Sequence, residues 1–148
     1  MRPESQGRIL IARPDIATPA IIDPNYLATE YDRRVSVALF LAIRNLFAQP
    51  ALAPFVVAEV DPSAGIETDD EIVDAYHRIG GSGYHAAGTC RMGTDDASVV
   101  DTSLRVRGVS GLRVVDISVM PSLVSGNTNA PAMAMASRAG ELILADAG

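Results

Sequence analysis

The chain has 148 residues, of which 48% are hydrophobic and 20% are charged. This balance is typical of a chain that folds around one core, and it argues against extended disorder. Its 12 lysines and arginines stand against 18 aspartates and glutamates, and the net charge of −6 argues against nucleic-acid binding. A single cysteine, Cys90, excludes an internal disulfide.

The N-terminal sequence MRPESQGR lacks the apolar segment of a signal peptide. No stretch reaches the roughly 20 apolar residues that a membrane-spanning helix needs. With one cysteine in the chain, which is compatible with a reducing compartment, we expect a cytoplasmic protein without a transmembrane segment.

The first half of the chain predicts one strand and two helices. GRILIAR predicts a short strand, and the prolines that follow indicate extended chain and a turn at Asp23-Pro24-Asn25. Apolar residues at helical spacing predict a helix over 32–49, with Asp32 as its N-cap and Pro50 ending it. After a loop at 58–68, Thr68 and Glu71 form a capping-box pair that opens a second helix, which Gly80 ends.

The second half predicts two short strands and one long helix. Residues 104–106 and 112–116 are apolar and flank a turn at 108–111, and the second of these strands is expected to be buried. Pro131 suits the first turn of a final helix. The expected inner face of this helix carries six apolar side chains: Ala132, Met135, Ala136, Ala139, Leu142 and Ile143. Because helices and strands alternate irregularly, we expect an α+β fold with short mixed or antiparallel strands.

Two clusters of residues suggest chemistry. In YHAAGTCRMG, residues 84–93, one histidine lies in a glycine-bounded loop. In SGNTNAPAM, residues 125–133, Asn127 comes just before the final helix. An imidazole accepts and releases a proton near neutral pH, so His85 is the first candidate for an acid–base residue.

These clusters, with RPESQGRILI at 2–11, IIDPNYL at 21–27 and LRVRGVSGLRVVDISVMP at 104–121, resemble the C-terminal region of the glucose-methanol-choline (GMC) family of flavin-dependent alcohol oxidoreductases. The resemblance is closest to the choline dehydrogenase-like and alcohol dehydrogenase-like bacterial members. No segment is decisive alone, but five in the same order are hard to produce by chance.

The resemblance implies a reaction and a set of site residues. His85 would take the proton of the alcohol while a hydride passes to the flavin of FAD, and Asn127 would hydrogen-bond the substrate oxygen. The residues expected to contact FAD are Asp116, Ile117, Asn127 and Thr128. The start of the final helix, with its free N–H groups and partial positive charge, would stabilise an anionic flavin ring.

One feature of the family is missing from the chain. No Gly-x-Gly-x-x-Gly loop, which would hold the FAD pyrophosphate, occurs in residues 1–148. We therefore expect a C-terminal part of a longer enzyme, in which residues 1–103 bind mainly substrate and residues 104–148 return to an FAD-binding domain whose main part is absent. The alternative is a catalytically silent remnant, or an accessory module that needs an FAD-binding N-terminal half or subunit as its partner.

The remaining candidates have simpler interpretations. His77 lies off the apolar face of its predicted helix and is expected on the surface. Cys90 invites a hydrolase hypothesis with His85, or a metal site with His77, but no third catalytic member or sufficient ligand set is present. We expect Cys90 to be a packing residue and Arg91 to pair with a carboxylate that holds the loop.

Overall fold

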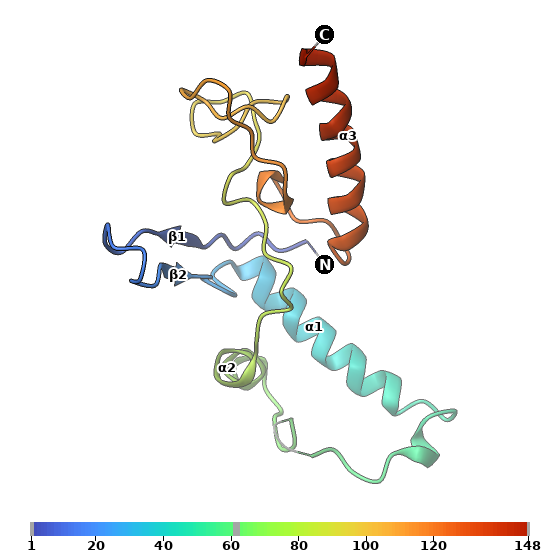
Figure 1. The fold of residues 1–148 in the computed structure, drawn as a ribbon. Helices are drawn as coiled ribbons and strands as arrows, with labels where there is room; N and C mark the ends of the chain where they lie inside the picture. The colour runs from blue at the N-terminus through green and yellow to red at the C-terminus, as the bar shows by residue number, and fades with distance from the viewer. Residues whose placement is uncertain (1, 61–62, 148) are drawn as a thin grey trace. The chain divides into compact units, whose positions relative to one another are not determined.

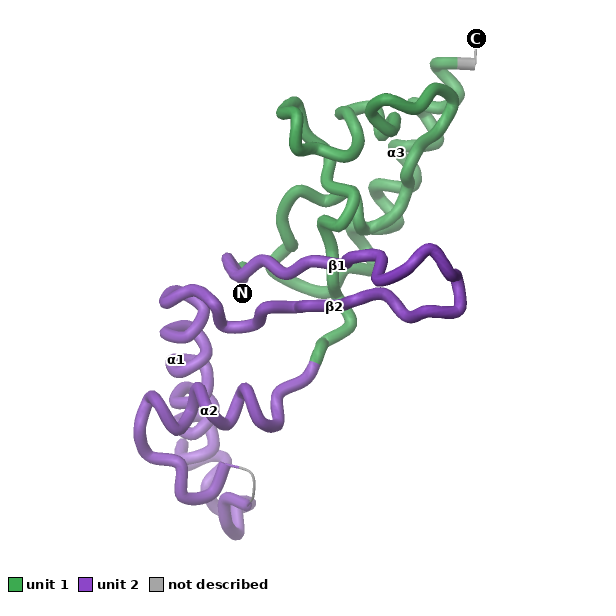
Figure 2. The backbone as a smooth tube through the Cα atoms, turned by 90° about the vertical axis from the view of Figure 1, so that its left-hand side faces the viewer, with its two compact units in different colours: residues 1–2, 82–148 green, residues 3–81 purple. Residues whose placement is uncertain are grey.

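The computed structural model describes residues 2–60 and 63–147, and it divides into two compact units. Unit 2 comprises residues 3–81 and unit 1 comprises residues 1–2 and 82–148 (Figure 2). Three helices and one two-stranded antiparallel sheet form the regular structure of the described residues, with short 3₁₀ turns between them (Figure 1). This is an α+β fold. Within the described residues, we find no helix with the length and hydropathy of a membrane span.

Unit 2 begins with a hairpin. Strand β1, Arg8–Leu10, pairs with β2, Ile21–Asp23, in an antiparallel register that places Ile9 opposite Ile22. The first strand was predicted, whereas the proline-flanked second strand was not. Asn25, after the second strand, adopts the left-handed conformation with φ 49° and donates its side-chain amide to the Gln6 carbonyl, which closes the base of the hairpin.

Helix α1, Glu30–Phe47, starts two residues before the predicted N-cap, Asp32. Thr29 is the N-cap, since its hydroxyl accepts the Asp32 N–H. Asp32, expected as the cap, is instead the third helical residue and is buried, where its carboxylate accepts the N–H groups of Glu4 and Ser5 at 3.0 and 2.7 Å. The carboxylate therefore ties the N-terminal segment to the helix.

Helix α2, Asp69–Ile79, has the predicted capping box, and Gly80 is its C-cap. Helices α1 and α2 pack together around a small core, which consists of Val37, Ile66, Ile72 and Ala75. The apolar stripe that predicts α1 lies largely outside this core, because Leu39, Ile43 and Leu46 are exposed. The predicted loop before α2 is confirmed for its described part, and Pro62 lies outside the described residues.

Unit 1 contains one helix, α3, Asn129–Ala147, and a series of short 3₁₀ and bridged segments that includes η2, Ile117–Val119. The two strands predicted at 104–106 and 112–116 are reduced to isolated bridges, in which Arg105 pairs antiparallel with Arg113 and Val106 with Val100. Leu104 has φ 64°, and the Asp101 carboxylate accepts the Arg105 N–H, so the chain bends before a longer ladder can form. The predicted turn between them is present, with Gly108 and Gly111 at positive φ.

The core of unit 1 joins these segments to α3. Its buried members are Val100, Leu104, Val119 and Ala139. The expected burial of residues 112–116 is wrong, since Leu112 and Val115 are exposed and only Val114 packs against this core. Along α3, Ala139 is buried as predicted and Met135 packs beside it, whereas Ala136 and Ile143 of the expected inner face are exposed.

Candidate active site

The loop that carries His85 is fixed to the η2 turn by backbone hydrogen bonds. The Cys90 N–H donates to the Ser118 carbonyl at 3.0 Å, and the Met92 N–H donates to the Val119 carbonyl at 2.8 Å. Gly88 has φ +92°, and a Cβ at this position would lie 3.3 Å from the Met120 carbonyl oxygen. Position 88 requires glycine because its backbone adopts a left-handed conformation close to the η2 backbone.

His85 is half-buried, and its ring contacts the residue that precedes α3. The distance from His85 Nδ1 to Thr128 Oγ1 is 2.8 Å, which is a hydrogen bond across 43 positions of sequence. The preceding residue, Tyr84, has an exposed side chain and φ 59°, a backbone conformation that is uncommon for a residue other than glycine. The bond to Thr128 holds the imidazole at Nδ1, and Nε2 remains for other partners.

The structure brings the two sequence clusters together. Asn127 comes directly before Thr128, and its side chain is exposed, as are Asn129 and Ala130 at the start of α3. The segment that carries Asn127 thus lies beside His85 through the Thr128 bond. Thr128 was predicted as a contact to cofactor. Its bond to His85 was not predicted, although Pro131, three residues after it, has no N–H for the Thr128 hydroxyl to accept.

Asp116 and Ile117 stand at the start of the η2 turn that the His85 loop pairs with. Asp116 is the N-cap of this turn, and its Oδ1 accepts the Ser118 N–H at 2.8 Å. Hydrogen bonds from the Ser118 side chain and backbone lower the pKa of the Asp116 carboxyl below its usual value. The exposed carboxylate is therefore ionised near neutral pH and has acceptor capacity left, while Ile117 behind it is partly buried.

The other sequence candidates have structural roles. Cys90 is partly buried and packs against the unit 1 core, as predicted, and Arg91 makes a two-point contact with Asp95, with nitrogen–oxygen distances of 2.9 and 2.6 Å. The Arg91 guanidinium holds the pKa of the Asp95 carboxyl far below its usual range. His77 is exposed on α2, also as predicted. Among the described residues, no three His, Cys, Asp or Glu side chains gather as metal ligands would.

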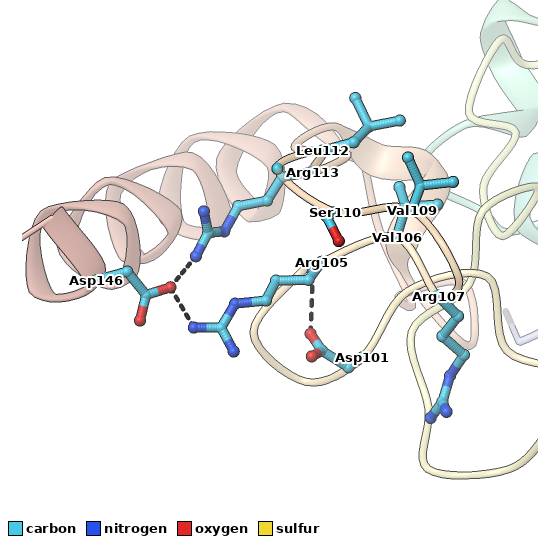
Figure 3. A pocket seen from close by; sticks show the side chains of 10 residues that line it. Asp101, Arg105, Val106, Arg107, Val109, Ser110, Leu112, Arg113 and Asp146 are labelled. Carbon is cyan, nitrogen blue, oxygen red and sulfur yellow. Dashed lines mark hydrogen bonds and ion pairs between the residues drawn. The ribbon is translucent and has the colours of Figure 1, made fainter.

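A pocket in unit 1 is lined by none of the predicted site residues (Figure 3). Figure 3 shows the guanidinium groups of Arg105 and Arg113 both directed at the carboxylate of Asp146, near the end of α3, and both form ion pairs with it. Arg107, also in the lining, donates to the Ser98 hydroxyl and the Gly93 carbonyl. The ion pairs of Arg105 and Arg113 with Asp146 join α3 to the segment 105–113, and the Arg107 guanidinium is bonded within the loops of unit 1.

Comparison with known proteins gives relatives over nearly the whole chain. The chain is 43% identical over 142 residues to an alcohol dehydrogenase [acceptor] of Pseudomonas putida, and the match covers 96% of this chain and 26% of that protein. It is 44% identical over 146 residues to the mitochondrial choline dehydrogenase of Homo sapiens, covering 97% and 24%. The chain thus spans about a quarter of the length of these relatives.

Solved structures agree in fold. Pyridoxine 4-oxidase from Mesorbium loti matches with a TM-score of 0.84 and 33% identity, covering 95% of this chain and 27% of that one. An FAD-dependent oxidoreductase from Chaetomium thermophilum matches with a TM-score of 0.87 and 31% identity, covering 95% and 24%. The family model described as GMC oxidoreductase, in its C-terminal part, matches residues 3–136. The motifs and the comparisons therefore agree that this chain belongs to the GMC oxidoreductase family and corresponds to the family's C-terminal region.

Proposed function

We propose that the chain is the C-terminal part of an FAD-dependent oxidoreductase that acts on the CH–OH group of a small alcohol, with His85 as its acid–base residue. The observation that carries this proposal is the half-buried imidazole of His85, bonded through Nδ1 to Thr128 beside the start of α3. An oxidation of this kind removes a proton from the hydroxyl and a hydride from the carbon. His85 has a nitrogen, Nε2, to receive the proton.

Asn127 is proposed to bind the substrate oxygen. Its exposed amide stands one residue before the partner of His85, so both side chains can serve one hydroxyl group. The amide N–H donates to an oxygen that gains negative charge as the proton leaves, and such a donor is most useful where charge develops.

The same unit offers groups that fit FAD. When bound, FAD would accept the hydride, which no side chain can do. The N–H groups of Asn127, Thr128 and Asn129 lie at the helix terminus, where partners for an anionic ring or carbonyl are expected. Thr128 would contribute through its backbone, because its hydroxyl is bonded to His85. The exposed Asp116 carboxylate would accept from hydroxyl groups of the ribityl chain, with Ile117 packed behind it.

Exposed apolar side chains support a further part of the enzyme as the partner of this chain. In unit 2, β1 and β2 leave Ile9, Leu10, Ile21 and Ile22 at least 46% exposed, and α1 leaves Leu46 54% exposed. Exposed apolar surface of this extent typically marks an interface. We propose that the FAD-binding part found in the longer relatives covers it. The whole site would then require both parts.

The second candidate is a silent remnant or an accessory module. It is favoured by the lack of a Gly-x-Gly-x-x-Gly loop within residues 1–148. On either hypothesis the isolated 148-residue chain binds FAD weakly, since most of the affinity comes from pyrophosphate contacts at such a loop. Stoichiometric FAD binding at micromolar concentration in equilibrium dialysis would contradict both.

The deciding experiment combines the chain with an FAD-binding part. The reconstituted flavoprotein is mixed without oxygen with choline, with a primary aliphatic alcohol, or with buffer, and the visible absorbance of the flavin is followed. Bleaching by an alcohol and none by buffer is the expected result. A flavoprotein that holds FAD but is reduced by dithionite and by no alcohol would favour the silent module.

A further inference from the structure

Each of the three helices is preceded by a threonine, and two of these threonines cap in the usual way. The hydroxyl of Thr29 accepts the N–H of Asp32 at 3.2 Å, and the hydroxyl of Thr68 accepts the N–H of Glu71 at 3.3 Å. In both cases the donor is the third residue of the helix, as is common for a threonine N-cap.

Thr128 stands in the same position before α3 but cannot make this bond. Its carbonyl accepts the N–H of Ala132 at 2.9 Å, which is the first helical hydrogen bond. The third residue of α3 is Pro131, and proline has no N–H to donate. The hydroxyl of Thr128 therefore cannot cap the third residue of its helix as Thr29 and Thr68 do.

The Thr128 hydroxyl is used by His85. Thr128 Oγ1 lies 2.8 Å from His85 Nδ1, with both side chains partly buried, and among the described residues His85 is the hydrogen-bond partner of this hydroxyl. In a neutral imidazole, one of the two ring nitrogens carries the proton. Which nitrogen this is depends on the hydrogen bond that the other one makes. The protonation pattern of the ring thus depends on whether Thr128 accepts or donates.

We propose that Thr128 is a positioning residue for His85: its Oγ1 accepts the Nδ1–H, which selects the tautomer whose Nε2 carries a lone pair. This inference rests on the proposed function, in which His85 takes the alcohol proton. Without a partner, a neutral histidine in water prefers the opposite tautomer, with the proton on Nε2. That form cannot accept a proton at Nε2.

The proton step follows from this arrangement. The substrate O–H bond breaks, the proton forms a bond to Nε2, and the electron pair stays on the substrate oxygen. The imidazolium that results keeps its Nδ1–H bond to Thr128, now charge-assisted and stronger than before. Thr128 touches neither substrate nor cofactor through its hydroxyl, and it acts on the reaction through the orientation and tautomer of His85.

The test is the tautomer of His85 in the 148-residue chain. The chain has only two histidines, so ¹⁵N-labelled histidine and two-bond proton–nitrogen correlation spectra, at a pH where the rings are neutral, assign both. His85 is expected with its proton on Nδ1. His77, exposed on α2, is expected with its proton mainly on Nε2 and serves as the internal reference.

Three variants complete the test. Thr128→Val, which has a similar shape and no hydroxyl, should move the His85 proton to Nε2, and Thr128→Ser should restore Nδ1–H. Thr29→Val, which removes the corresponding hydroxyl before α1, should leave His85 unchanged. A wild-type His85 with the proton on Nε2, or a Thr128→Val spectrum identical to wild type, would overturn the inference. If Thr128→Val fails to fold, wild type and Thr128→Ser still decide it.

Activity separates this inference from the function on which it rests. In the reconstituted flavoprotein, Thr128→Val should lower kcat by about tenfold or more with KM little changed, and Thr128→Ser should recover most of it. If Thr128→Val shifts the His85 tautomer but neither Thr128→Val nor His85→Ala changes turnover, the tautomer assignment stands and the proposed function is contradicted. Turnover lost in His85→Ala, with the tautomer unmoved in Thr128→Val, would contradict this inference alone.

Discussion

The two units are built by different kinds of interaction. Unit 2 consists of a hairpin and two capped helices, whose contacts follow from local rules of spacing and capping. Unit 1 contains one helix and a set of loops joined by single backbone bonds between distant residues, such as Met92 to Val119. The candidate active site lies entirely in unit 1. Irregular segments held by a small core carry the candidate residues, as is common where loops are positioned by a rigid support.

The largest expected effect is on the core of unit 2. Ile72 is completely buried between α1 and α2, so Ile72→Ala should lower the free energy of unfolding by about 2–5 kcal/mol. Ile79 on the same helix is 52% exposed, and Ile79→Ala should cost less than about 1 kcal/mol. Residue-specific hydrogen exchange measures both. Loss of protection confined to unit 2 would show that the two units unfold separately, whereas equal loss in unit 1 would show one cooperative fold.

Asp32 gives the next largest effect. Burial opposes the charged form of this carboxyl, but hydrogen bonds from Ser5, Glu4 and Thr29 outweigh it and lower the pKa below the usual 3.8. Asp32→Ala leaves the N–H groups of Glu4 and Ser5 without this acceptor and should destabilise unit 2 by about 1–3 kcal/mol in chemical denaturation.

The same residue predicts a dependence on pH. Because the folded pKa lies below the unfolded one, the stabilisation by Asp32 is fully present above pH 3.8 and is lost as the pH falls through the folded pKa. In Asp32→Asn the acid loss of stability between these values should be smaller. An acid denaturation curve that is unchanged in this variant would contradict the assigned role.

The three helix starts give a smaller effect with a built-in comparison. Thr68→Ala removes a working cap and should destabilise α2 by about 1 kcal/mol. Thr128→Ala removes no bond to the third residue of α3, since that residue is Pro131, and should change the helix by only a few tenths of that amount. Amide exchange in the first turn of each helix measures the difference. Equal losses would mean that Thr128 caps its helix after all.

The smallest effect is expected at the ion pairs of Asp146. Arg105 and Arg113 lower the pKa of the Asp146 carboxyl, the Arg105 hydrogen bond being the largest cause, but the Asp146 and Arg105 side chains are exposed and salt screens their charges. Asp146→Asn should therefore loosen the end of α3 slightly at low salt and hardly at all at high salt. A loss of α3 protection that persists at high salt would mean that Asp146 stabilises the helix by more than exposed charge pairing.

The sequence predicts unit 2 better than unit 1 for a physical reason. The capping box of Thr68 and Glu71 is a local signal and is confirmed. Asp32 as N-cap is wrong because Thr29 was available three residues earlier and because the carboxylate is used by residues that are distant in sequence. The periodicity that predicts α1 does not identify its buried face, since the helix is apolar on more than one side.

In unit 1 the outcome depends on contacts that no local pattern reveals. The strands expected at 104–106 and 112–116 fail because a left-handed Leu104 and the Asp101 carboxylate bend the chain. The loop of His85 and the start of α3 were both identified from motifs, and the bond between His85 and Thr128 joins them. Pro131 at the third helical position is the local signal that Thr128 has a partner other than its own helix.

The acid–base role of His85 is tested most directly by turnover in the reconstituted flavoprotein with each histidine replaced in turn. His85→Ala should lower alcohol-dependent turnover by roughly 10²–10⁴-fold, the range expected for loss of an acid–base residue, while FAD content stays unchanged. His77→Ala, on the exposed face of α2, should leave turnover as it is. Unchanged turnover in His85→Ala would contradict the acid–base role and leave His85 with a structural role as the partner of Thr128.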